Sequence, residues 1–189
     1  MQVDYYLVPQ SPWTYLGHRP FWDIARRHGA SIRLKPFDLG GRVFPVSGGL
    51  PLGKRAPQRQ AYRLVELERF SNWLGVPINK QPRFFPVSGD DAARLIIAVD
   101  LHDGIEASMR VDELSIADEK VLAALLQRAE VAARRLEDSH SQQVQETYER
   151  YTQEAIDAGV FGAPSYVIDG EIFWGQDRLD FVERRLTQG

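Results

Sequence analysis

The 189-residue chain contains no cysteine, so it can form no disulfide bond, thiolate metal site or cysteine nucleophile. This favours a cytoplasmic protein, because disulfides belong to oxidising compartments. The sequence also lacks a positive excess, since 23 Lys and Arg residues stand against 26 Asp and Glu residues and the net charge is −3. Nucleic acids bind to basic surfaces. We therefore expect no nucleic-acid partner.

Long apolar runs are missing as well. No run approaches the roughly 20 residues of a membrane helix, and the start MQVDYYLV has no basic segment of the kind that opens a secretory signal. We therefore expect neither a membrane span nor secretion. The remaining composition, 43% hydrophobic and 26% charged, is typical of a soluble globular protein, and the length fits one domain with or without an insertion.

Strand and helix signals alternate at the start of the chain. Residues Val3–Val8 predict a strand, and Ile32–Phe37 predict a second one. Between them, Ser11 is a good N-cap for a helix that begins with Pro12 and runs to about His28. A helix that connects two strands of one sheet makes them parallel, so the chain opens with a β-α-β unit.

The rest of the chain reads as a helical block followed by a hairpin. Residues Leu39–Pro57 are rich in glycine and predict a long loop. Helices are then predicted at Pro57–Leu74, Asp90–His102, Asp118–Arg135 and Ser139–Ala158. Two strands, Ser165–Ile168 and Glu171–Trp174, flank the hairpin signal Asp169-Gly170, and a last helix begins near Asp177.

The order β-α-β, helical block, β-β-α is that of a thioredoxin fold with an insertion. We predict an α/β protein in which residues 1–56 and 159–189 form a thioredoxin-like domain. Residues 57–158 then form an inserted all-helical domain.

Ser11 lies where the first strand meets the first helix. Backbone N–H groups and the helix dipole favour an anion at such a position. Thioredoxin-like proteins place a Cys-x-x-Cys motif here, whereas this chain has Ser11-Pro12-Trp13-Thr14. A hydroxyl cannot carry out thiol–disulfide exchange, but it can donate a hydrogen bond to a thiolate from another molecule. The same residues also fit a plain N-cap with a first-turn proline.

Two features late in the sequence are candidates for the same face. Ala163-Pro164 precedes the third strand, where thioredoxin-like folds have a cis-proline whose preceding residue pairs with an extended ligand. A trans-proline that starts a strand is the alternative. A helix beginning near Asp177 offers N–H groups to a carboxylate, and the Asp177 side chain could hold an ammonium group; simple capping is the alternative.

The chain resembles 2-hydroxychromene-2-carboxylate isomerases, in the kappa-class glutathione transferase and DsbA-like group of thioredoxin folds. The matching stretches are SPWTYLG (Ser11–Gly17), FDLGG (Phe37–Gly41), SGGLPLGKRAPQRQAYR (Ser47–Arg63), FFPVSGDDAARLI (Phe84–Ile96) and GVFGAPSYVIDGEIFWGQDRL (Gly159–Leu179). They cover almost the whole chain, and the last stretch is highly specific.

The resemblance implies that glutathione is the cofactor and that Ser11 lies beside its sulfur. It implies further that Ala163 and Pro164 hold the cysteinyl part and that the γ-glutamyl end is held by Trp174, Gly175, Gln176 and Asp177. The family reaction interconverts 2-hydroxychromene-2-carboxylate and trans-o-hydroxybenzylidenepyruvate, in aromatic-compound breakdown. The thiolate adds, the ring opens, a bond rotates and glutathione is eliminated unchanged. The resemblance also implies a homodimer.

The implied substrate is an aromatic carboxylate, which needs a basic group and a surface for its ring. The candidates are Arg42, Lys54 and Arg55 for the carboxylate and Trp13, Phe84 and Phe85 for the ring. Solvated loop charge is the alternative for each basic residue. The chain departs from its relatives at Lys54, where asparagine is common, and at Val8-Pro9, where an acidic-aromatic pair is common. These departures concern the substrate more than glutathione.

Several other patterns predict no site. Residues 48–54 (GGLPLGK) resemble a nucleotide-binding loop, but Arg55 stands where a Ser or Thr would bind magnesium. The segment Arg42–Gly48 recurs almost unchanged as Arg83–Gly89, and the sequence suggests no function for the repetition. The four histidines have no metal-ligand spacing, so we expect no metal.

Two other functions remain open at this point. A kappa-class transferase would release a stable glutathione conjugate, and a non-catalytic protein would bind glutathione or an extended peptide in the same groove. A DsbA-like oxidoreductase is excluded, because the chain has no thiol.

Overall fold

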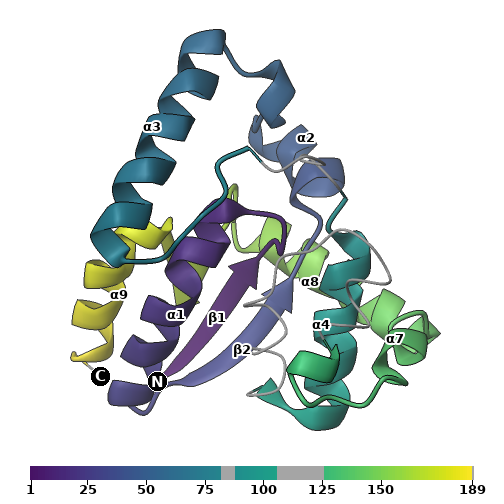
Figure 1. The fold of residues 1–189 in the computed structure, drawn as a ribbon. Helices are drawn as coiled ribbons and strands as arrows, with labels where there is room; N and C mark the ends of the chain where they lie inside the picture. The colour runs from purple at the N-terminus through teal and green to yellow at the C-terminus, as the bar shows by residue number, and fades with distance from the viewer. Residues whose placement is uncertain (82–87, 106–125, 189) are drawn as a thin grey trace.

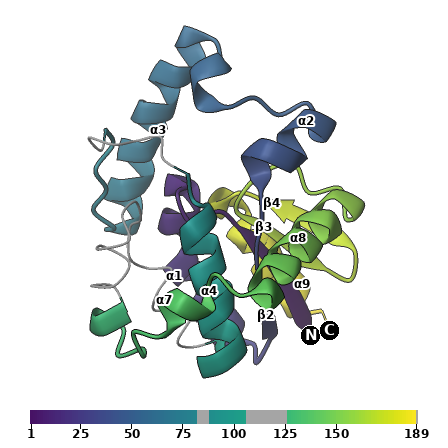
Figure 2. The ribbon, with the colours of Figure 1, turned by 90° about the vertical axis from the view of Figure 1, so that its right-hand side faces the viewer.

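The computed structural model describes residues 1–81, 88–105 and 126–188. This part of the chain forms one four-stranded mixed sheet in the order β2-β1-β3-β4. Figure 1 shows β1 and β2 side by side, and Figure 2 shows β3 and β4. The strands are β1 (Gln2–Leu7), β2 (Ser31–Pro36), β3 (Ser165–Ile168) and β4 (Glu171–Trp174). β1 pairs in parallel with β2 and antiparallel with β3, and β3 pairs antiparallel with β4. The predicted β-α-β and β-β-α units are confirmed.

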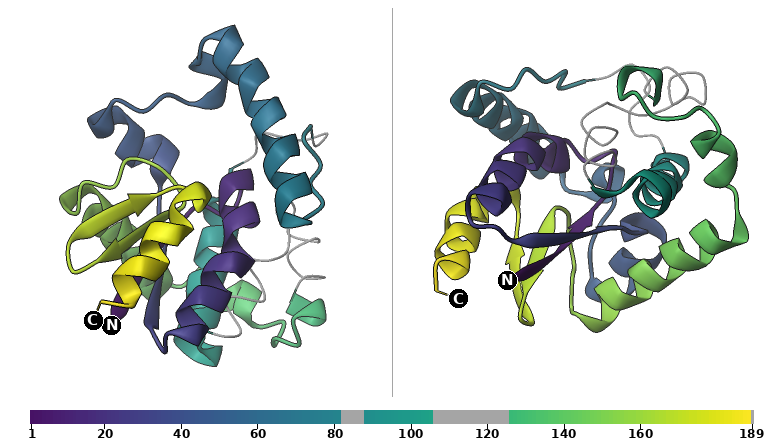
Figure 3. Two further views of the ribbon diagram at one scale, coloured as in Figure 1. Left: turned by 90° about the vertical axis from the view of Figure 1, so that its left-hand side faces the viewer. Right: turned by 90° about the horizontal axis from the view of Figure 1, so that it is seen from below.

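Helices cover both faces of the sheet because side chains alternate along β1. Val3 and Tyr5 belong to the core cluster that also contains Phe21 of α1 (Pro12–Arg27) and Val182 of α9 (Leu179–Leu186). On the other face, Tyr6 and Val8 share a cluster with Ala155 of α8 (Gln142–Asp157). Figure 3 shows α1 and α9 on one side of the strands and α8 on the other.

The β3–β4 hairpin turns at Asp169-Gly170, as predicted. Both residues have positive φ angles, 49° for Asp169 and 84° for Gly170. Such angles are those of the two-residue turns that match the right-handed twist of paired strands.

Helix α4 (Asp90–Asp103) is also confirmed, and it shares the core of the sheet. Its residues Leu95, Ile96 and Val99 lie in the same cluster as Val3 and Tyr5. Its opposite face packs on α8, beside which it lies in Figure 2. The helical block is therefore joined to the sheet by buried contacts, and its division into a separate domain stays a prediction.

Helix α3 (Pro57–Leu74), also predicted, projects beyond the sheet (Figure 1). Among its residues only Leu67 is buried, and Trp73 is 76% exposed. Its last turns reach α1, where the rings of Phe70 and Trp13 meet edge to face with centroids 6.0 Å apart.

The predicted loop over Leu39–Pro57 is wrong in part, because it contains three short helical turns. These are a π-helical turn at Leu39–Val43, helix α2 at Phe44–Ser47 and a 3-10 turn at Leu52–Lys54. The first is capped by Asp38, whose carboxylate accepts a hydrogen bond from the Gly41 N–H at 2.7 Å. Of the residues in these turns only Val43 is buried, so no apolar period was there to reveal them.

The predicted helix over Asp118–Arg135 lies partly outside the described residues. Its described remainder is not continuous, because Glu130 adopts a left-handed conformation with φ 57°. A separate short helix, α7 (Arg135–Asp138), begins only at the predicted end. The last helix also differs slightly, since a 3-10 turn at Gln176–Arg178 precedes α9.

A buried ion cluster joins the sheet to α8. Lys35 is 5% exposed, and its ammonium group donates hydrogen bonds to Asp4 at 2.9 Å, to Glu154 at 2.6 Å and to the Tyr6 hydroxyl at 3.4 Å. Burial lowers the pKa of Lys35, but the hydrogen bonds to the two carboxylates outweigh it and the net shift is upward. Lys35 is therefore held charged inside the fold.

In residues 1–81, 88–105 and 126–188, no helix combines the length and apolar character that crossing a membrane requires. The same residues bring together no group of three or more His, Asp or Glu side chains that could hold a metal ion.

Candidate functional site

Ser11 is the N-cap residue of α1. Its hydroxyl oxygen accepts a hydrogen bond from the Thr14 N–H at 3.3 Å, and its extended backbone (φ −81°, ψ 120°) leads the chain from β1 into the helix. The side chain is half-buried, and the first turn of α1 contains no acidic residue. The positive end of the helix is therefore not neutralised locally, which suits a site for an anion.

Thr14 is the second hydroxyl of the Ser-Pro-Trp-Thr motif, and it is placed differently from Ser11. Its side chain is 1% exposed, and its Oγ1 has no hydrogen-bond partner among the described residues. Of the two hydroxyls, Ser11 is the one that a ligand can reach.

The Ala163–Pro164 peptide bond is cis, which decides between the cis and trans alternatives that the sequence left open. In the antiparallel register Ser165 pairs with Tyr6, so Pro164 lies beside Leu7, at the end of β1 that leads to Ser11. The carbonyl of Pro164 accepts a hydrogen bond from the Gly175 N–H at 2.9 Å. Sheet pairing therefore brings two segments that are about 150 residues apart in sequence to one place.

Trp174 and its neighbours lie against this segment. The Trp174 and Phe161 rings meet edge to face with centroids 4.8 Å apart, and Trp174 is 50% exposed. The indole also lies on the backbone of Gly162, where an added Cβ would clash with the indole nitrogen. An aromatic surface thus borders the Ala163-Pro164 segment.

Gln176 and Asp177 continue from there toward α1. Gln176 is buried against Gly17 of α1. The Asp177 carboxylate accepts a hydrogen bond from Arg178 at 2.6 Å, so an ammonium group at Asp177 would share it with that guanidinium. The predicted glutathione-binding residues are therefore arranged around the start of α1.

The predicted substrate-binding residues are spread over several elements. Trp13 packs on α3, but Arg42 follows β2 and its guanidinium contacts Gln153 of α8 at 3.5 Å. Lys54 is exposed at the end of its 3-10 turn, and Arg55 donates to the Leu50 carbonyl at 2.8 Å. Phe84 and Phe85 lie outside the described residues.

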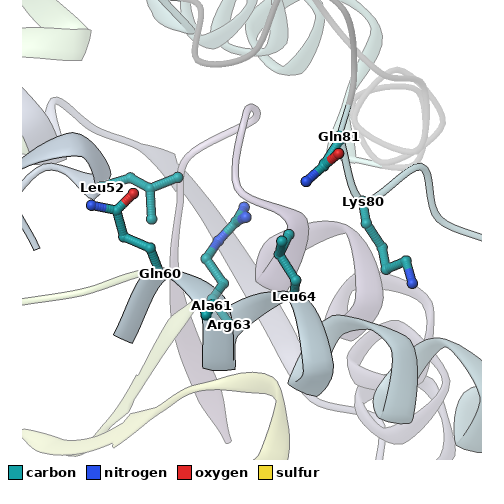
Figure 4. Close-up of a pocket in the computed structure, with 7 residues that line it drawn as sticks. All are labelled: Leu52, Gln60, Ala61, Arg63, Leu64, Lys80 and Gln81. Atoms are coloured by element: carbon teal, nitrogen blue, oxygen red, sulfur yellow. The ribbon is translucent and has the colours of Figure 1, made fainter. Parts of the chain in front are cut away.

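A pocket of about 280 Å³ lies beside Arg55, on the inner side of α3. It is lined by Leu52, Gln60, Ala61, Arg63, Leu64, Lys80 and Gln81. Figure 4 shows the Arg63 guanidinium pointing into the space between Leu52 and Gln81. The sequence interpretation did not single out Arg63, which is four residues before the buried Leu67 and thus on the same helix face.

Comparison with known proteins settles the family. The DSBA-like thioredoxin domain matches residues 2–187. The chain belongs to that family. A relative, the 2-hydroxychromene-2-carboxylate isomerase of Sphingobium xenophagum, is 29% identical over 97% of each chain.

Two solved structures share the fold of this DSBA-like protein. A selenomethionine 2-hydroxychromene-2-carboxylate isomerase superimposes with a TM-score of 0.82 at 24% identity, over 100% of this chain and 95% of that one. The cytosolic disulfide reductase DsbM from Pseudomonas aeruginosa with GSH gives a TM-score of 0.67 at 16% identity, over 99% of this chain and 100% of that one. The predicted thioredoxin-like fold is thus confirmed.

Gly17→Ala is expected to destabilise this DSBA-like protein by about 1–3 kcal/mol, the usual cost of overpacking. The new Cβ would lie 2.6 Å from the Cβ of Gln176 and 3.2 Å from the Tyr166 hydroxyl. At an open helix position the same change would stabilise by about 1 kcal/mol. Chemical denaturation measures the sign of the change in the free energy of unfolding. In the control Gly53→Ala, where nothing lies within 4 Å of an added Cβ, we expect a small change. A stabilised Gly17→Ala protein would contradict the close approach of α1 and Gln176.

Proposed function

We propose that this protein is a glutathione-dependent isomerase that interconverts 2-hydroxychromene-2-carboxylate and trans-o-hydroxybenzylidenepyruvate. The observation that carries the proposal is Ser11, a hydroxyl at the helix N-terminus where thioredoxin-like proteins have a reactive thiol, in a chain without cysteine. The name and full-length coverage of the Sphingobium xenophagum relative support the same reaction. A homodimer and a cytoplasmic location stay predictions.

The residues around Ser11 fit glutathione by the chemistry of their groups. The Ser11 hydroxyl and the N-terminal N–H groups of α1 are donors for an anion. The main chain at Ala163 precedes a strand and suits an extended peptide. Trp174 offers an aromatic surface, and Gln176 and Asp177 offer polar groups at the other end.

In this reaction glutathione and Ser11 have different roles. Bound glutathione supplies the thiolate, the nucleophile that the chain itself lacks. Ser11 stabilises negative charge on sulfur by donating its proton in a hydrogen bond, and it does not attack the substrate. Because the dipole of α1 acts on the same point, the two effects favour the thiolate over the thiol.

An absorbance assay with the chromene carboxylate tests the proposal. We expect a spectral change that requires glutathione, with the glutathione concentration unchanged at the end of the reaction. Mass spectrometry of the products provides the second readout. A stable glutathione conjugate would replace the isomerase with a kappa-class transferase. Glutathione binding without any spectral change would replace it with a non-catalytic binding protein.

A further inference from the structure

Gln10 directly precedes Ser11 and lies between the starts of two helices. It is the third residue of the turn Val8–Ser11, which is closed by a hydrogen bond from the Ser11 N–H to the Val8 carbonyl at 2.9 Å. Helix α1 begins directly after this turn, and α4 begins beside it, because the Gln10 amide lies against Gly89, the N-cap residue of α4. Both helices begin at the end of the sheet to which β1 points (Figure 1).

The Gln10 amide takes the place of a side chain at Gly89. A Cβ added to Gly89 would clash with the amide oxygen of Gln10 and would lie 2.9 Å from its nitrogen. The φ angle of Gly89 is −101°, so the backbone conformation itself does not require glycine. Glycine is needed at this position for space, because the amide of Gln10 occupies the volume that an N-cap side chain would fill. Accordingly, Gly89 supplies no side-chain cap to α4.

Burial of the Gln10 amide is costly for the stability of the fold. Its oxygen is buried and has no hydrogen-bond partner within the described part of the chain. A buried polar atom without a partner loses its hydrogen bonds to water and gains none in return. The partial positive charge at the start of α4 favours the oxygen on that side, but it does not replace a hydrogen bond. A glutamine held in this way indicates a purpose other than stability.

Helix α4 offers Gln10 a fixed support. Half of its 14 residues are buried. At its first residue, the Asp90 carboxylate accepts hydrogen bonds from the Tyr148 hydroxyl of α8 at 2.9 Å and from the Ser88 hydroxyl at 2.8 Å. The start of α4 is therefore held from a second helix. Through Gln10, the turn that leads to Ser11 is packed against this fixed point.

We propose that Gln10 is a positioning residue for Ser11: its amide, packed against Gly89, fixes the turn Val8–Ser11 and thereby the place of the Ser11 hydroxyl. The hydroxyl needs such support, because the hydrogen bond that it accepts from the Thr14 N–H is long, at 3.3 Å. The backbone of the turn therefore sets where the hydroxyl lies. That this hydroxyl acts on bound glutathione rests on the proposed function.

Substitutions on the two sides of the contact test the proposal. Gln10→Ala removes the amide, and Gly89→Ala expels it. In the double variant the added methyl group enters the space that the amide has left, so its effect should be smaller than the two single effects combined. Gln142→Ala is the matched control, since Gln142 is exposed and its amide donates to Glu146 at 2.7 Å. Thermal melting verifies that each variant is folded.

Amide hydrogen exchange measured by NMR is the first readout, and it requires no glutathione. We expect the Ser11 N–H, which bonds to the Val8 carbonyl, to exchange about 10-fold faster in Gln10→Ala and in Gly89→Ala. The Ala30 N–H, beyond the other end of α1, should exchange as in wild type. Unchanged exchange at Ser11 in both single variants would overturn the proposal. So would an equal increase at Ala30, because it would show a general loss of stability.

Kinetics and the pKa of bound glutathione give the second readout. We expect Gln10→Ala to lower kcat about 10- to 100-fold at an unchanged KM, as for a misplaced catalytic group, with partial recovery in the double variant. The measured thiol pKa of bound glutathione should rise, because a displaced Ser11 hydroxyl stabilises the thiolate less. Gln142→Ala should resemble wild type. A wild-type kcat and thiol pKa in Gln10→Ala would refute the positioning role. Faster exchange at Ser11 in variants of a protein that does not bind glutathione would uphold that role and refute the proposed function.

Discussion

Replacing Ser11 with alanine is expected to lower the kcat of the proposed isomerase about 10²- to 10³-fold, or by about 2.7–4 kcal/mol of transition-state stabilisation. This is the usual cost of removing one donor to a developing anion. Ser11 is the half-buried hydroxyl at the positive end of α1, and Thr14 cannot replace it because its side chain is 1% exposed. Steady-state kinetics at saturating glutathione measures the loss.

The same substitution also removes a helix cap, so the kinetic effect needs a matched control. Loss of an N-cap costs about 0.5–2 kcal/mol of stability. Ser141 caps α8 in the same way, accepting a hydrogen bond from the Val144 N–H at 3.4 Å. Ser141→Ala should lose similar stability while its kcat stays unchanged. If Ser11→Ala keeps the wild-type rate, Ser11 is a cap and nothing more.

Replacing Lys35 with methionine is expected to lower the free energy of unfolding by about 3 kcal/mol, the lower end of the range for breaking a buried ion pair. Methionine fills a similar volume, but it leaves the carboxylates of Asp4 and Glu154 without their shared cation. The lower end applies because Asp4 still pairs with Arg33, and Glu154 with Arg150. Urea denaturation at neutral pH measures the change.

Acid should reduce the difference in the free energy of unfolding between wild type and Lys35→Met. Burial raises the pKa of Glu154, but hydrogen bonds from Lys35 and Arg150 outweigh it, and the net pKa lies below the ordinary 4.5. A carboxyl group whose pKa is lowered by folding contributes stability at pH values above its ordinary pKa. That stability is lost as the pH falls through the folded-state pKa. Below that pH range Glu154 is protonated and needs no cation, so the unfolding curves of wild type and Lys35→Met should converge.

A surface pair supplies the control for Lys35. Arg27 pairs with Glu183 at 2.7 Å, but its side chain is 57% exposed. Arg27→Met should therefore cost only about 0–1 kcal/mol. A loss of similar size in Arg27→Met and Lys35→Met would show that the buried cluster is no more important than a surface ion pair.

Features that depend on neighbouring residues were predictable from the sequence. The Ser11 cap bonds three residues along the chain, and the Asp169-Gly170 turn depends on the conformations of its own two residues. The absence of cysteine is a property of composition, and it excludes thiol chemistry by the chain itself. The strands of the thioredoxin-like fold followed from the same local patterns.

Only the tertiary structure decided which residues far apart in the sequence lie close together. The register of β3 on β1 places Pro164 near the Ser11 loop, and packing on the sheet encloses Lys35 between Asp4 and Glu154. The short turns after Leu39 carry no periodic pattern, and the contact of α3 with α1 depends on Phe70 and Trp13. Each of these rests on contacts between residues far apart in the sequence, which local propensity does not specify. The sequence by itself thus determined that the chain supplies no thiol of its own, and the fold decided which residues surround Ser11.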